Sequence, residues 1–177
     1  MARQTNNAHA HTHTYSRVGW RRRLLSTNHS DIGTMYLALA VVGGLIGGLS
    51  SVLIRMELMV PGVQFMLTDG APDGQLWNVT ITAHGLIMVF FMIVPAMIGG
   101  FGNWMVPLMI GASDVAFPRL NLLSFWLLCA ALIAFLAAVM TGQGVGTDWT
   151  IYRNLSLDVE HPGPPVNMAM LALVLAG

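Results

Sequence analysis

The chain has 177 residues, of which 55% are hydrophobic and only 9% are charged. Soluble domains carry about a quarter charged residues, so this composition excludes an ordinary water-soluble enzyme, and its hydrophobicity excludes a disordered chain. Eight basic and eight acidic residues give a net charge of zero, which provides no global field for nucleic acid. The single cysteine excludes a disulfide framework. The composition is therefore that of a membrane protein.

Residues 1–25 form a polar N-terminal tail that contains five of the eight arginines. His9, His11 and His13 alternate with small residues, as in a metal-binding tract. Three histidines without a cysteine make a weak metal site, and a solvated tail is the simpler interpretation. An arginine cluster before an apolar segment favours the cytoplasmic (or matrix) side of a membrane, so we expect the N-terminus there.

Four charge-free apolar runs follow the tail. A spanning helix needs about 20 apolar residues at a rise of about 1.5 Å each, which the first three runs provide and the fourth provides in part. The runs are Ile32–Ile54, Gly74–Ser113, Leu120–Thr147 and the stretch from Val166 to Gly177. We therefore predict an all-α fold, a polytopic transmembrane helix bundle with three full spanning helices plus the start of a fourth. Alternation places the acidic loop around Glu57 outside and the loop with Asp114 inside.

An ionisable residue, His84, lies within the second apolar run. Such residues are costly at membrane depth and indicate a functional site by default. Gly85 leaves space beside the imidazole. Met88, Phe91 and Met92 continue one helical face, which would suit a macrocycle held by an axial histidine, although plain helix packing would give the same stripe. No other histidine lies within an apolar run, so a six-coordinate haem would need its second ligand from another segment or chain.

Further polar residues lie near the predicted membrane boundaries. Arg55 closes the first apolar run, where it either extends to the interface or donates hydrogen bonds to a buried group. Asp114 follows the second run, with Asn103 before it and Asn121 after it. A carboxylate near amides that hold water is what a proton-uptake path needs, and a polar turn is the alternative interpretation.

Five motifs extend the analysis beyond single residues. They are Ser26-Thr27-Asn28-His29-Ser30-Asp31-Ile32-Gly33, Arg55-Met56-Glu57-Leu58, Thr82-Ala83-His84, Gly99-Gly100-Phe101-Gly102-Asn103-Trp104 and Asp114-Val115-Ala116-Phe117-Pro118-Arg119-Leu120-Asn121. Together they resemble subunit 1 of the haem–copper oxidases, in the cytochrome c oxidase branch. The family differs at three places, with a lysine at the position of Ser30, a second asparagine at Leu122 and two prolines at Arg153-Asn154.

The resemblance implies a cofactor role for the outer half of the bundle. His84 is expected to be one axial ligand of a low-spin haem a, and Arg55 to hydrogen-bond the formyl group of that haem. Glu57 and Gly62 are expected to bind calcium or sodium at the outer face. The second haem and the copper of the oxygen-reducing centre would be bound by a part of the subunit outside this sequence.

The resemblance also implies a proton path at the inner face. Its expected members are Asp114, the entry carboxylate of the D channel, with Asn103, Asn121 and His29. Residues 26–177 would be the N-terminal part of the subunit 1 transmembrane domain, inactive alone, whether as a truncated chain or as one half of a split subunit. Expected partners are the remainder of subunit 1, oxidase subunits 2 and 3, cytochrome c and membrane lipid, with no nucleic acid. The expected location is a bacterial cytoplasmic membrane or, alternatively, the mitochondrial inner membrane.

Two other functions are compatible with the same residues. The first is a helical proton or cation pathway without a cofactor, built on Asp114, Asn103 and Asn121. The second is a non-catalytic assembly fragment that contributes packing helices only. Light absorption by a bound haem distinguishes the oxidase from both alternatives.

Overall fold

The computed structural model describes residues 24–157, 161 and 163–177. The histidines of the polar tail lie outside the described residues. Helix α2 (His29–Glu57) is followed by a two-stranded hairpin in which β1 (Leu67–Thr68) pairs antiparallel with β2 (Ala71–Pro72). A long helical segment comprises α3 (Gly74–Leu86), η1 (Ile87–Ile93), η2 (Pro95–Gly102) and α4 (Asn103–Met109). Helices α5 (Pro118–Met140) and α6 (Pro165–Ala176) complete the described elements.

Three of these helical segments are long and apolar enough to cross a membrane: α2, the segment Gly74–Met109 and α5. Helix α6 is shorter and apolar. The predicted bundle, with three full spans and the start of a fourth, is confirmed, and the chain is a multi-pass membrane protein. Helix α5 ends before its apolar run does, because Gly142 and Gly144 adopt left-handed φ angles of 58° and 71°.

The middle of the second span is not a regular α-helix. Residues Ile87–Ile93 and Pro95–Gly102 form π-helical turns, in which the N–H of Val94 bonds the carbonyl of Val89, five residues back. Pro95 lacks an N–H and so breaks the regular bonding pattern of the helix. The π-helical stretch separates the part of the span that carries His84 from the part that carries Asn103.

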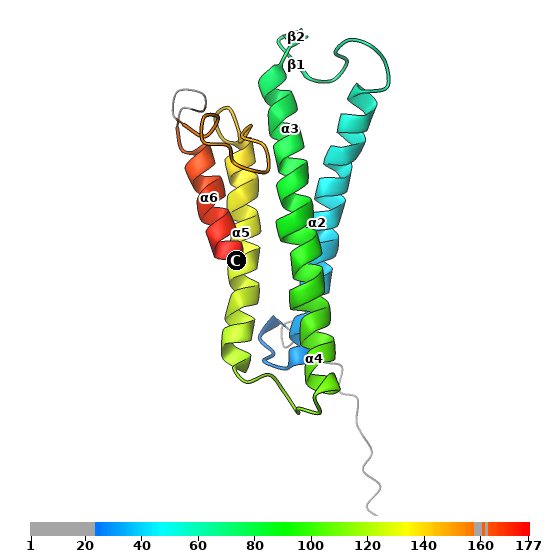
Figure 1. Ribbon diagram of the computed structural model, residues 1–177, viewed down its shortest axis with the longest axis vertical. Coiled ribbons are helices and arrows are strands. Elements are labelled where there is room, and N and C mark those ends of the chain that lie inside the picture. Colours follow the sequence, from blue (N-terminus) through cyan, green and yellow to red (C-terminus); the bar gives the residue numbers. More distant parts are fainter. Residues whose placement is uncertain (1–23, 158–160, 162) are drawn as a thin grey trace, which may run out of the picture.

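The helices pack as two neighbouring pairs (Figure 1). Helix α2 lies along the second span, and α5 lies along α6. The buried core contains residues from all of these helices, including an edge-to-face pair, Tyr36 and Phe125, with ring centroids 5.3 Å apart. Small residues permit the first pair to approach closely, since a side chain at Gly43 would lie 2.5 Å from the carbonyl oxygen of Phe91.

The loops gather at two opposite ends of the bundle. In Figure 1 the β1–β2 hairpin and the connection between α5 and α6 lie at the upper end, whereas the start of α2 and the connection between α4 and α5 lie at the lower end. Glu57 and Asp114 are therefore at opposite ends, as the alternation of spans predicts.

Asp73 caps the N-terminus of α3. Its carboxylate accepts hydrogen bonds from the amides of Gln75 and Leu76 at 2.9 and 3.0 Å and from the hydroxyl of Thr68 at 2.5 Å. The Thr68 hydroxyl and the Leu76 amide hold the pKa of Asp73 below its usual value. A depressed pKa means that the charged carboxylate stabilises the folded state.

We expect Asp73→Ala to lower the thermal unfolding temperature at neutral pH, because the first amides of α3 lose their acceptor. The contribution is complete above the usual carboxyl pKa and is lost as the pH falls through the lower folded-state pKa, so the difference from the wild type should shrink in acid. Asp69→Asn, which removes an exposed carboxylate from the same hairpin, is the control. A difference that does not change with pH would contradict this account.

Candidate functional site

His84 lies in the last turn of α3 and is half-buried. Its Nδ1 is 2.8 Å from the carbonyl oxygen of Gly47 in α2. A carbonyl only accepts, so Nδ1 carries a proton and donates it, and in the tautomer that this bond selects the lone pair lies on Nε2. Nε2 has no hydrogen-bond partner among the described residues. This is the arrangement of a metal-binding histidine, in which one nitrogen is oriented by a carbonyl and the other is free to ligate.

Glycine at position 47 makes this contact achievable. A side chain there would begin 2.8 Å from the sulfur of Met88, so a larger residue would require the Met88 side chain to shift. Phe91 does not extend an open apolar wall beside His84, because its ring is fully buried 5.7 Å from that of Phe135. Of the two interpretations of the helical face that contains Phe91, ordinary helix packing is therefore the correct one for this residue.

Among the described residues, no hydrogen bond joins Arg55 to His84, whose Nδ1 bonds the carbonyl of Gly47 instead. Arg55 lies exposed in the last turn of α2, eight residues beyond Gly47, which corresponds to about 12 Å of helix. Both residues belong to the half of the bundle that carries the hairpin. Arg55 thus lies closer to the hairpin end of the bundle than His84 does. In the part of the chain that the structure describes, no carboxylate forms an ion pair with Arg55.

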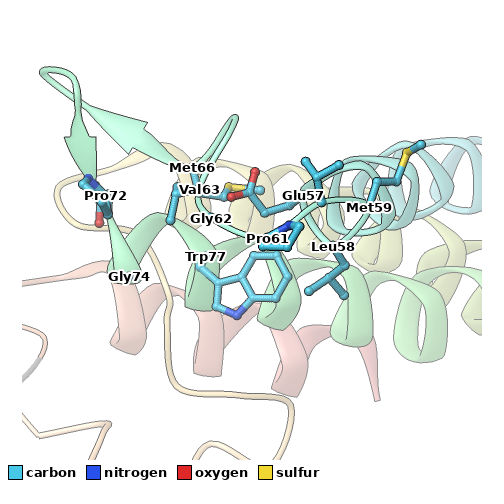
Figure 2. A pocket seen from close by; sticks show the side chains of 12 residues that line it. Glu57, Leu58, Met59, Pro61, Gly62, Val63, Met66, Pro72, Gly74 and Trp77 are labelled. Carbon is cyan, nitrogen blue, oxygen red and sulfur yellow. The ribbon is translucent and has the colours of Figure 1, made fainter.

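Glu57 and Gly62 line a cavity of about 820 Å³ next to the hairpin, together with Trp77 (Figure 2). The Glu57 carboxylate is buried and accepts hydrogen bonds from the amides of Gln64 and Phe65 at 3.0 and 2.8 Å. Within the described part of the chain, no group of three or more His, Cys, Asp or Glu residues could hold a metal ion. A hard cation here would therefore depend on further oxygen ligands, such as backbone carbonyls and water.

Three of the predicted proton-path residues meet at the other end of the bundle. The side-chain amide of Asn121 donates to Oδ1 of Asn103 at 2.7 Å, and Nδ1 of His29 donates to the backbone carbonyl of Asn103 at 2.9 Å. His29 is buried and is the first residue of α2, which begins three residues before the apolar run Ile32–Ile54 does. The helix begins earlier because Asn28 caps it by accepting the amide of Ser30.

Asp114 adjoins this group without bonding to it. Its carboxylate accepts from the amide of Val115 at 2.8 Å and lines a cavity of about 390 Å³ that Asn103 also lines. The structure thus connects Asp114 with Asn103 through a shared cavity rather than through a direct contact.

Two residues that the sequence analysis did not single out continue the polar chain into the bundle. The hydroxyl of Ser124 donates to the carbonyl of Asn121 at 2.8 Å and lies 2.7 Å from the hydroxyl of Tyr36. A signal was present in the spacing, because Ser124 follows Asn121 by three residues and so lies on the same helical face. The hydrogen-bonded series therefore runs from His29 to Tyr36 across α2, α4 and α5.

The fold and these contacts define a multi-pass membrane protein with a half-buried, hydrogen-bonded histidine toward one end and a series of hydrogen-bonded polar residues near the other. Residues 31–177 match the family described as "Cytochrome C and Quinol oxidase polypeptide I", and the chain belongs to this family. The resemblance stated from the motifs is confirmed.

Individual relatives support the same assignment. The chain is 46% identical over 158 residues to "Cytochrome c oxidase subunit 1" of Mytilus edulis, covering 89% of this chain and 28% of that protein. It is 45% identical over 157 residues to "Cytochrome c oxidase subunit 1" of Yarrowia lipolytica (strain CLIB 122 / E 150), covering 89% of this chain and 29% of that protein. The chain therefore spans less than a third of the length of these relatives.

Proposed function

We propose that the chain is the N-terminal part of the catalytic subunit of a terminal respiratory oxidase. The whole subunit would carry electrons from cytochrome c through a low-spin haem to a haem–copper centre that reduces oxygen to water, coupled to proton pumping. The observation that supports this role best is the hydrogen bond from His84 Nδ1 to the Gly47 carbonyl, which leaves Nε2 free to ligate. The family and its cytochrome c oxidase relatives supply the context.

His84 would hold the low-spin haem a, which supplies reversible one-electron transfer when bound. The Gly47 carbonyl fixes the ring orientation and tautomer of His84 and raises the basicity of Nε2. Arg55, further out on α2, would donate a charge-assisted hydrogen bond to the formyl group of the haem. The donor set fits the group, since a neutral imidazole with a carbonyl behind it is a common axial ligand.

Asp114 would take up protons from the inner aqueous phase. The cavity that it shares with Asn103 has room for water, and the amide of Asn121 orients the side chain of Asn103. His29, Ser124 and Tyr36 add groups that can both donate and accept along the series. Leu122 packs against the buried core, so it contributes no polar group to this path.

Replacing Asp114 with asparagine should slow proton uptake and oxygen reduction by about ten-fold or more, because the path loses the group that changes charge at its entrance. Stopped-flow measurement of proton uptake by the assembled oxidase tests this. Asp69→Asn, which removes an exposed carboxylate at the opposite end of the bundle, should leave uptake unchanged. Equal rates in the wild type and Asp114→Asn would remove Asp114 from the path.

The remaining roles follow the same assignment. Glu57 and Gly62 would bind calcium or sodium at the outer face, with Glu57 as the charged ligand. The other partners would be the remainder of subunit 1, oxidase subunits 2 and 3, cytochrome c and membrane lipid. The N-terminus would face the cytoplasm or matrix of a respiratory membrane.

A reduced-minus-oxidised difference spectrum of the purified complex, followed by haem extraction, tests the proposal. A low-spin haem band is the expected result. A colourless complex would contradict the proposal. Proton conduction by such a colourless protein after reconstitution would then favour the cofactor-free pathway, for which the hydrogen-bonded series from His29 to Tyr36 is the supporting observation.

A further inference from the structure

One part of the connection between α5 and α6, residues 144–147, is buried in the bundle, whereas most of the described residues around it are exposed. We refer to residues 144–149 as the inserted loop. Its first four residues are buried, and Val145 and Thr147 are fully buried. Loops normally stay at the surface because buried backbone N–H and C=O groups need partners. The partners of the inserted loop therefore show what holds it in place.

Two side chains outside the loop supply these partners. Nε2 of His161 accepts the amide of Gly146 at 3.1 Å, and the hydroxyl oxygen of Thr82 accepts the amide of Asp148 at 2.9 Å. The Thr82 side chain is fully buried, and its hydroxyl proton is committed to the carbonyl of Asn78 at 2.7 Å. Its lone pairs are thus oriented away from Asn78 and are available to the loop amide.

The bond to Thr82 supports the backbone at Asp148. Asp148 has a φ of 64°, in the left-handed region, which is uncommon for residues other than glycine, although aspartate adopts it more readily than most. Such a conformation persists where the surroundings hold it, and the bond to Thr82 is made by the amide of this very residue. Loss of the Thr82 hydroxyl would leave the amide of Asp148, in its left-handed conformation, without its protein acceptor.

The inserted loop contacts the backbone that carries His84. Thr82 precedes His84 by two residues. The Cβ of Trp149 lies 3.4 Å from the point where a side chain would begin at Gly85, the residue after His84. The loop is thus packed against α3 at the level of the candidate haem ligand.

We propose that Thr82 is a positioning residue that clamps the inserted loop onto α3 and thereby excludes water from the outer side of the His84 segment. The inference rests on the proposed haem ligation by His84. The exclusion of water and the low polarity that it creates set the reduction potential of a bound haem, because water stabilises the oxidised, more highly charged state.

The test compares three variants of the assembled oxidase. Thr82→Val keeps the shape of the side chain and removes the hydroxyl, whereas Thr82→Ser retains the hydroxyl. Thr80→Val is the matched control, because Thr80 makes the same bond to the carbonyl four residues back, at 2.8 Å, and accepts no loop amide. The readouts are the reduction potential of the low-spin haem and hydrogen–deuterium exchange of residues 146–150.

Thr82→Val is expected to lower the reduction potential and to accelerate exchange of the Asp148 amide about ten-fold. Thr82→Ser and Thr80→Val should resemble the wild type in both measurements. Unchanged exchange in Thr82→Val would overturn the clamp, and faster exchange with an unchanged potential would overturn its role at the haem.

A second variant tests the proposal in case Thr82→Val does not assemble into the oxidase. If Thr82→Val does not assemble, the double variant Thr82→Val/Asp148→Gly should assemble, because glycine adopts the left-handed φ without strain. A double variant that still fails to assemble would contradict the proposal. The variant His84→Ala tests the proposed function separately. If His84→Ala retains the low-spin band, haem ligation by His84 is refuted. If His84→Ala loses the band while Thr82→Val keeps the exchange rate and the reduction potential of the wild type, only the clamp is refuted.

Discussion

Replacing His84 with alanine should abolish the low-spin haem band of the assembled oxidase completely. A haem iron held by two imidazoles would change its spin state on losing one, and no other described histidine lies within a spanning segment away from its ends. The measurement is a reduced-minus-oxidised spectrum in the visible region.

The matched control for this variant is Met92→Ala. Met92 lies two turns further along the same span and is half-buried, so its truncation disturbs local packing without removing a nitrogen ligand. Met92→Ala should retain the band. An unaltered spectrum in His84→Ala would exclude His84 as the ligand, and loss of the band in both variants would show that the segment tolerates no truncation.

The second large effect is expected at Gly43, where α2 and η1 approach most closely. A methyl group there would lie 2.5 Å from the backbone oxygen of Phe91 and 3.0 Å from its carbonyl carbon. Backbone atoms cannot rotate away, so the two helices must separate, and the Phe91–Phe135 contact in the core would separate with them. We expect Gly43→Ala to lower the free energy of unfolding by about 1–3 kcal/mol.

Gly48→Ala is the control for this substitution. Gly48 lies in the same helix, and no atom lies within 4 Å of the position of an added Cβ. Alanine should therefore be neutral there or stabilise the helix by up to about 1 kcal/mol, because glycine is the weaker helix former. Unfolding in detergent, followed by circular dichroism, compares the two variants. Equal stability of Gly43→Ala and Gly48→Ala would contradict the close approach of α2 and η1.

The sequence predicted the helices well because charge is excluded from the hydrocarbon region. Their ends were harder to predict, since hydropathy does not change where a helix stops in a neutral loop. Residues 141–147 are free of charge, yet the helix has already ended at Met140, and the chain folds back as the inserted loop. The π-helical turns between Ile87 and Gly102 carry no signature in the apolar pattern.

The site was predictable where its chemistry is conspicuous. A histidine or a carboxylate is rare enough in an apolar sequence to stand out, so His84 and Asp114 could be proposed as site residues from the sequence. Gly47 and Thr82 were not, because a glycine and a threonine are common in membrane helices and act here through partners 37 and 66 positions away. Such contacts depend on how two helices are rotated against each other, which a single sequence does not specify.

The pairing of consecutive helices has a consequence for biogenesis. Helix α2 finds its main partner in the span that directly follows it, and α5 finds its own in α6. Neighbours in the chain reach each other faster than distant segments do, since less loop entropy must be lost. A nascent chain that leaves the insertion machinery in this order can close each hairpin before the next emerges, and the hydrogen bonds of Asn121 and Tyr36 then join two units that are already formed.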